Sequence, residues 1–117
     1  MSRNLPYSRA ERVAKNLYQI VAEYIYKNID DERLRGVQIT STRMTNDLGI
    51  ARIYFYIDGG KDKKDAAKAA FEEIKPEIRY NVGKELILRT VPKLEFHMDD
   101  GVENAERIET ILNTLKH

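Results

Sequence analysis

A proline lies in the middle of the longest helical pattern in this sequence. Apolar residues recur at helical spacing between about residues 62 and 88, at Ala67, Phe71, Ile74, Ile78 and Val82. Pro76 falls within this stripe. Because proline lacks a backbone N–H and clashes with the preceding turn, it kinks or breaks a helix. We therefore predict two helices, over about 62–75 and 77–88, which share one buried face.

The chain before this stripe predicts a helix and a β-hairpin. Ser8 and Glu11 form a capping-box pattern at the start of a helix over about 8–29. Residues 37–44 are rich in β-branched side chains, and residues 51–57 alternate between apolar and polar. Turn-forming residues separate these two segments, so we expect them to pair as neighbouring strands.

The chain after the stripe predicts one more strand and one more helix. Pro92 precedes a strand over 93–98, in which Leu94, Phe96 and Met98 point inward, and a helix follows over about 102–116. The predicted order is α-β-β-α-(kink)-α-β-α. This order favours an α+β fold in which helices cover one face of a three-stranded sheet.

Length and composition favour a single binding domain over an enzyme. The chain has 117 residues and no cysteine, which excludes disulfides and thiolate zinc sites. His97 and His117 are the only histidines, so we expect no metal and no cofactor. Neither a signal peptide nor an apolar run long enough to span a membrane is apparent, so we expect a cytoplasmic protein.

Basic residues are the main candidates for a functional surface. At helical spacing Lys68, Lys75 and Arg79 line one edge of the kinked pair, and Lys84 and Arg89 lie near the end of its second helix. Arg12 and Lys15 share the outer face of the first helix, with Arg9 at its flank. Such side chains can neutralise the phosphates of a nucleic acid. The alternative is a solvated helix surface whose aliphatic stems cover the core.

Two further features each allow a functional and a structural interpretation. Arg52, Tyr54 and Tyr56 share one strand face, where they either stack bases or form ordinary cross-strand pairs. The break at Lys75-Pro76 either exposes N–H groups that bind an anion, as in KH domains, or merely bends a helix.

The order and spacing of several short segments resemble the ribosome-binding factor A family. The resemblance covers nearly the whole chain and is carried by Arg12-Val13-Ala14, Asp31-Glu32-Arg33-Leu34, Asp47-Leu48, Ala51-Arg52-Ile53-Tyr54, Ile78-Arg79, Gly83-Lys84, Leu88-Arg89-Thr90-Val91-Pro92-Lys93-Leu94-Glu95-Phe96 and Asp99.

This resemblance implies a type II KH-like fold and a non-enzymatic assembly factor. Such a factor binds the free small ribosomal subunit, assists late maturation and processing of its ribosomal RNA, and matters for growth in the cold. The family has been linked to the 5′-terminal helix region of that RNA. We expect a monomer. The alternatives are another KH-type RNA-binding regulator and a protein-interaction adaptor.

The predicted kink departs from the family pattern. The resemblance implies an Ala-x-Gly junction between the two helices, where this chain has Ile74-Lys75-Pro76. Proline enforces a bend by steric exclusion but offers no N–H to an RNA backbone. We therefore expect contact through the side chains of Lys75 and Arg79.

The net charge of +1 conceals an uneven distribution. Residues 98–117 hold five acidic residues against two basic ones, a net charge of −3, which leaves +4 for residues 1–97. Nucleic-acid binding depends on local charge more than on the total. We therefore expect RNA contact from one basic face, with the C-terminal helix pointing away from phosphate.

Overall fold

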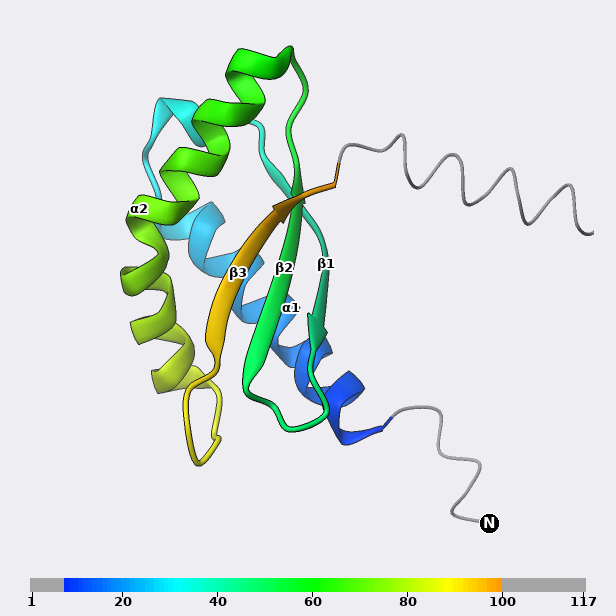
Figure 1. Ribbon diagram of the computed structural model, residues 1–117. Coiled ribbons are helices and arrows are strands. Elements are labelled where there is room, and N and C mark those ends of the chain that lie inside the picture. Colours follow the sequence, from blue (N-terminus) through cyan, green and yellow to red (C-terminus); the bar gives the residue numbers. More distant parts are fainter. Residues whose placement is uncertain (1–7, 100–117) are drawn as a thin grey trace, which may run out of the picture.

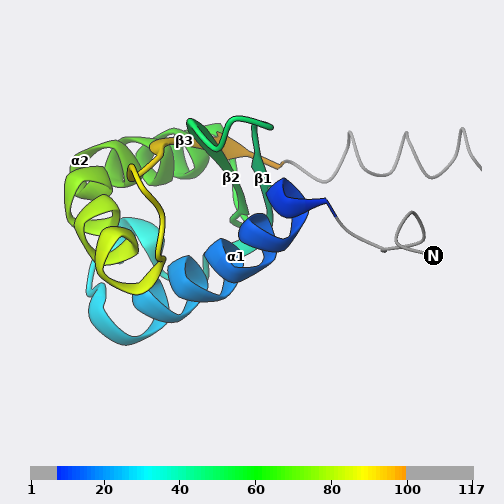
Figure 2. The same cartoon turned by 90° about the horizontal axis from the view of Figure 1, so that it is seen from below.

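Two long helices cover one face of a three-stranded sheet in the computed structural model, which describes residues 8–99 (Figures 1 and 2). The elements in chain order are α1 (Arg9–Asn28), the 3-10 turn η2 (Glu32–Leu34), β1 (Gln38–Met44), β2 (Ile50–Tyr56), α2 (Lys61–Glu85) and β3 (Lys93–Met98). The predicted α+β class and sheet coverage are confirmed. The helix predicted over 102–116 lies outside the described residues.

The central strand β2 pairs with a different partner on each side. It runs antiparallel to β1 and parallel to β3, so α2 is the crossover between two parallel neighbours. The register places Tyr54 beside His97 and Arg52 beside Arg43. A bulge between Ile39 and Ser41 shifts the pairing along β1.

The core lies between the sheet and the helices. Alternate residues of β2 are fully buried, as predicted, and they are Ala51, Ile53, Phe55 and the following Ile57. Phe71 of α2 is also fully buried, and its ring centroid lies 4.6 Å from those of Phe55 and Phe96. One aromatic cluster therefore joins α2 to both parallel strands.

The start of α1 confirms the predicted capping box. The Glu11 N–H donates to the Ser8 hydroxyl at 3.2 Å, and the Ser8 N–H donates to the Glu11 carboxylate at 2.9 Å. These bonds satisfy backbone donors that the first helical turn leaves without partners. Val13, Leu17 and Val21 are then buried along the inner face.

The predicted division of the second helical region is wrong. α2 is a single helix from Lys61 to Glu85, and Pro76 lies inside it on the exposed side. The helix axis changes direction along its length, so the chain bends without ending the helix (Figure 1). Ile78 and Val82 remain fully buried beyond the proline, which keeps both halves on the same core.

A link between α2 and the segment after α1 was not predicted. The Arg33 guanidinium donates to Asp31 at 2.8 Å and to both Glu73 carboxylate oxygens at 2.8 and 3.0 Å. The hydrogen bonds from Arg33 hold the pKa of the Glu73 carboxyl below its ordinary value. The 3-10 turn that carries Arg33 also buries Leu34.

Replacing Phe71 with alanine should destabilise the fold by about 3–5 kcal/mol, because a buried ring leaves a cavity between two strands and a helix. Urea denaturation of the full chain measures the free energy of unfolding. Tyr80→Ala on the same helix is the control, since Tyr80 is 71% exposed, and should change stability by no more than about 0.5 kcal/mol. Equal effects of the two variants would contradict the described core.

Replacing Glu73 with glutamine should lower stability at neutral pH and have less effect in acid. A carboxyl whose pKa is lowered by folding contributes stability above its unfolded pKa, and this contribution is lost as the pH falls through the folded pKa. The difference between wild type and variant should therefore shrink below pH 4.5, the ordinary pKa of this carboxyl. Denaturation in pH steps checks this, with the exposed Glu32→Gln as control. A pH-independent difference would rule out the ion pair as its source.

Candidate nucleic-acid interface

A basic groove lies between the second half of α2 and the start of β3. This α2–β3 groove has a volume of about 820 Å³ and is lined by Lys75, Pro76, Arg79, Tyr80, Gly83, Lys84, Val91, Lys93 and Leu94. Four of these residues are cationic, and no carboxylate is among the described residues that line the groove. This charge distribution suits an anionic ligand such as a phosphate.

Two of the groove cations are held in place by the protein itself. The Arg79 guanidinium donates to the Val91 carbonyl at 2.9 Å and to the Pro92 carbonyl at 3.0 Å. Arg79 therefore fastens the loop before β3 to α2. Lys75 lies 2.7 Å from the Glu72 carboxylate, and its hydrogen bond is the largest cause of a lowered pKa at that carboxyl.

The other two groove cations are exposed. The Lys84 ammonium lies 5.3 Å from the centre of the Tyr80 ring, which is within cation–π range. Lys93 begins β3 on the side of the strand away from the core. Both can therefore reach a ligand without giving up an ion pair within the described residues. Tyr80, at 71% exposed, adds an aromatic surface beside them.

A glycine permits the close approach of the loop to α2. A Cβ atom at Gly83 would lie 3.0 Å from a Val91 methyl carbon. A larger residue there would require the Val91 side chain to shift by a few tenths of an ångström. The wall of the groove thus depends on Gly83 together with the Arg79 hydrogen bonds.

The structure does not support the interpretation in which a helix break at Pro76 exposes backbone N–H groups to an anion. Because α2 is continuous, its interior N–H groups are used in the helix's own hydrogen bonds. Of the three predicted kink residues, Ile74 packs against the core, whereas Lys75 and Pro76 line the groove. The structure therefore favours the bent-helix interpretation, with side chains as the contacting groups.

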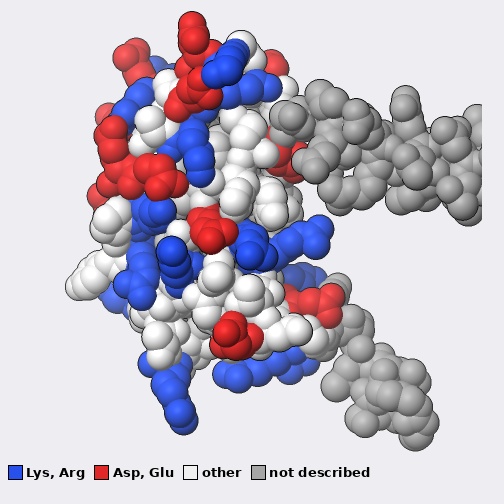
Figure 3. All heavy atoms as spheres, in the orientation of Figure 1, with Lys and Arg blue, Asp and Glu red and all other residues white. Residues whose placement is uncertain are grey.

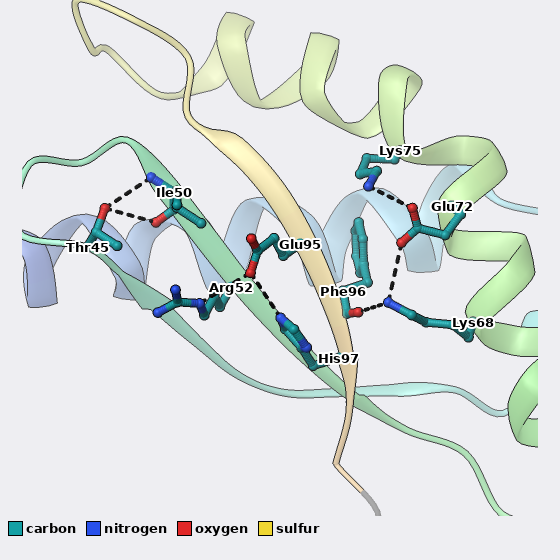
Figure 4. Close-up of polar contacts among 9 residues, drawn as sticks. All are labelled: Thr45, Ile50, Arg52, Lys68, Glu72, Lys75, Glu95, Phe96 and His97. Atoms are coloured by element: carbon teal, nitrogen blue, oxygen red, sulfur yellow. Dashed lines mark hydrogen bonds and ion pairs between the residues drawn. The ribbon is translucent and has the colours of Figure 1, made fainter.

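The remaining predicted basic residues lie elsewhere. Lys68 donates to the Phe96 carbonyl and lies 3.4 Å from Glu72, so it joins α2 to β3 away from the groove (Figure 4). Arg89 is exposed in the loop before β3. Arg9, Arg12 and Lys15 are exposed on α1, and Lys15 lines a separate hollow of about 1440 Å³ between α1, β1 and residues 85–88.

Sequence reasoning missed Lys93 and Tyr80 as groove residues. Tyr80 follows Arg79 on α2, so its position on the helix wheel was available. Lys93 lies seventeen residues after Pro76 and reaches the groove only because β3 packs beside α2. No local spacing carries that information.

The open face of the sheet, on the side away from the helices, carries a second polar cluster. Glu95 of β3 accepts hydrogen bonds from Arg52 at 3.2 Å and from His97 at 3.1 Å, as Figure 4 shows. These bonds, with His97 the larger cause, hold the pKa of the Glu95 carboxyl below its ordinary value. The Tyr54 and His97 rings stack with centroids 5.4 Å apart.

Metal chemistry and membrane spanning find no support in the described part of the chain. Within residues 8–99, no three side chains of histidine, aspartate or glutamate are grouped so that they could hold a metal ion. Neither α1 nor α2 combines the length and the hydropathy that crossing a bilayer requires.

Comparison with known proteins assigns the chain to a family. The family model described as ribosome-binding factor A matches residues 9–112. A ribosome-binding factor A from Desulfatibacillum aliphaticivorans is 37% identical over 107 residues, which cover 92% of this chain and 87% of the relative. These matches extend across both the groove and the open face.

Solved structures show the same fold. The crystal structure of ribosome-binding factor A from Thermus thermophilus superposes with a TM-score of 0.69 at 19% identity, covering 76% of this chain and 93% of the other. A homology model of the Thermus thermophilus factor, fitted into a cryo-electron microscopy map of its complex with the 30S subunit, gives 0.64 at 20% identity, covering 77% and 93%. These structures show the fold, and the sequence matches establish that the chain belongs to the ribosome-binding factor A family.

Proposed function

We propose that this protein binds the free small ribosomal subunit through its ribosomal RNA and assists late maturation and processing of that RNA. The observation that carries the proposal is the α2–β3 groove, which gathers four cations on a member of a ribosome-binding family. The fitting of a Thermus thermophilus relative into a map of a 30S complex supports the choice of subunit. The protein acts in the cytoplasm as a single KH-like domain and a monomer.

The proposed mechanism is binding without turnover. A factor that binds one RNA arrangement more tightly than another shifts the population toward the first, in proportion to the difference in affinity. The groove supplies the phosphate contacts, and the sheet behind it keeps their spacing rigid. The 5′-terminal helix region of the ribosomal RNA is the proposed target. Growth in the cold is the proposed condition in which this binding matters most.

The predicted basic residues divide into two roles under this proposal. Lys75 and Lys84 contact phosphate directly, together with Lys93, which was not predicted. Arg79 and Lys68 instead shape the surface through their bonds to backbone carbonyls. A second contact of the same RNA involves α1 and the loop before β3, through Arg9, Arg12, Lys15 and Arg89. Under this proposal, the RNA contacts thus come from the α2–β3 groove, from α1 and from the loop before β3.

Sedimentation of a cell lysate tests the choice of partner. The protein should migrate with free small subunits and not with large subunits or messenger RNA. A regulator of messenger RNA, which is the first alternative, would instead appear with polysomes or in light fractions. Absence of the protein from the small-subunit fractions would contradict the proposal.

Charge reversal in the groove tests the binding surface. Lys84→Glu with Lys93→Glu should weaken binding to purified small subunits and reduce the salt slope of the binding constant by about one for each phosphate that is no longer neutralised. Both residues are exposed, so the fold should persist. Arg79 is left intact because its reversal would release the loop before β3.

Lys27→Glu with Arg35→Glu is the matched control for the groove variant. These two substitutions change the net charge by the same amount as the groove variant, and neither residue lines the groove. An equal fall in affinity in both variants would indicate a general charge effect. Wild-type binding that does not change with salt would favour a protein-interaction adaptor, the second alternative.

A further inference from the structure

We propose that the open face of the sheet binds an unpaired base of single-stranded RNA, which stacks on the Tyr54–His97 pair. This inference rests on the proposed function, because the base belongs to the same RNA whose phosphates occupy the α2–β3 groove. The residues concerned are Arg43 of β1, Arg52 and Tyr54 of β2, and Glu95 and His97 of β3.

The two rings already stack on each other, and a base can extend this short stack. Tyr54 and His97 are register partners on neighbouring parallel strands, with ring centroids 5.4 Å apart and ring planes inclined by 29°. The His97 side chain is 44% exposed. Because every base has a π-face, such a surface accepts any base by stacking.

A hydrogen-bonded carboxylate holds this surface in position. Glu95 lies between Arg52 and His97 and bonds to both, so the imidazole and the guanidinium are fixed on the same face (Figure 4). Side chains that are ordered before binding lose less conformational entropy when a ligand arrives. The face is therefore prepared for a flat ligand.

The charges on the open face complement a phosphate backbone. Arg43 lies directly opposite Arg52 in the antiparallel register, and like charges in that position destabilise a sheet. Arg52 is compensated by Glu95, whereas Arg43 makes no ion pair with any residue in the described range 8–99. A phosphate beside Arg43 would relieve this repulsion.

The open face is continuous with the α2–β3 groove. Lys93, Glu95 and His97 alternate on the same side of β3, so the groove residue Lys93 lies about 13 Å from the stacked pair. Figure 3 shows Lys and Arg side chains across the middle of this side of the molecule. One strand of RNA can therefore follow the groove and continue onto the sheet.

Fluorescence of a modified RNA tests stacking directly. The probe is a short single-stranded oligonucleotide of abasic residues with one 2-aminopurine, the only base that can stack, whose fluorescence falls when it stacks on an aromatic ring. The chain contains no tryptophan, so little protein emission interferes. Wild-type protein should quench the probe, and Tyr54→Ala should lose quenching and bind about 5- to 150-fold more weakly, the range for one stacked base.

Two controls separate stacking from sheet stability. Tyr54→Phe retains the ring and should keep both quenching and affinity within about twofold. The same oligonucleotide with an abasic residue also in place of 2-aminopurine should bind the wild type about 5- to 150-fold more weakly than the intact probe does. That comparison uses only wild-type protein, so it holds even if Tyr54→Ala fails to fold.

The possible outcomes distinguish the two proposals. Absence of quenching by the wild type, or equal affinity for intact and abasic probes, would overturn the stacking site. If the small subunit still binds in a salt-dependent manner, the proposed function survives that result. Quenching without any binding of small subunits would retain the base site and reject the ribosomal partner.

Discussion

The contact on which the rest of the structure depends is the packing of Phe71 between Phe96, on which it stacks, and Phe55, to which it is tilted. The three rings are fully buried, and they join the crossover helix α2 to the two parallel strands that it connects. Offset and stacked aromatic pairs contribute about 0.5–1.5 kcal/mol each beyond their buried area. Because this contact places α2 beside β3, it also determines the position of the groove on one side and of the open face on the other.

Features set by neighbouring residues could be predicted from the sequence. The alternation over residues 51–57 correctly separates the buried side chains of β2 from its open face, and Ser8 with Glu11 marks the helix start. Pro76 shows where such reasoning fails. An isolated helix would break there, but Ile78 and Val82 are buried beyond it, and their burial outweighs a cost of about 3 kcal/mol. Tertiary packing therefore decides whether a proline ends a helix or only bends it.

The candidate site likewise combines features that the sequence predicts with features that depend on tertiary packing. Helical spacing places Lys75 and Arg79 along one edge of α2, and both line the groove together with Lys84. The roles of Arg79 and Lys68 could not be predicted, because their partners are backbone carbonyls of a strand and loop distant in sequence. The Tyr54–His97 stack likewise requires the parallel register of β2 and β3, which no pattern within either strand contains.

The bulge between Ile39 and Ser41 has a consequence for how copies of this chain behave together. β1 forms one border of the described sheet, and no strand within residues 8–99 pairs with its outer backbone groups, which is the arrangement that invites a strand from another molecule. An irregular border interrupts the even spacing of donors and acceptors that such pairing needs, and the charged Arg43 nearby adds repulsion between identical chains. The irregularity of β1 is therefore of the kind that disfavours edge-to-edge joining of identical chains.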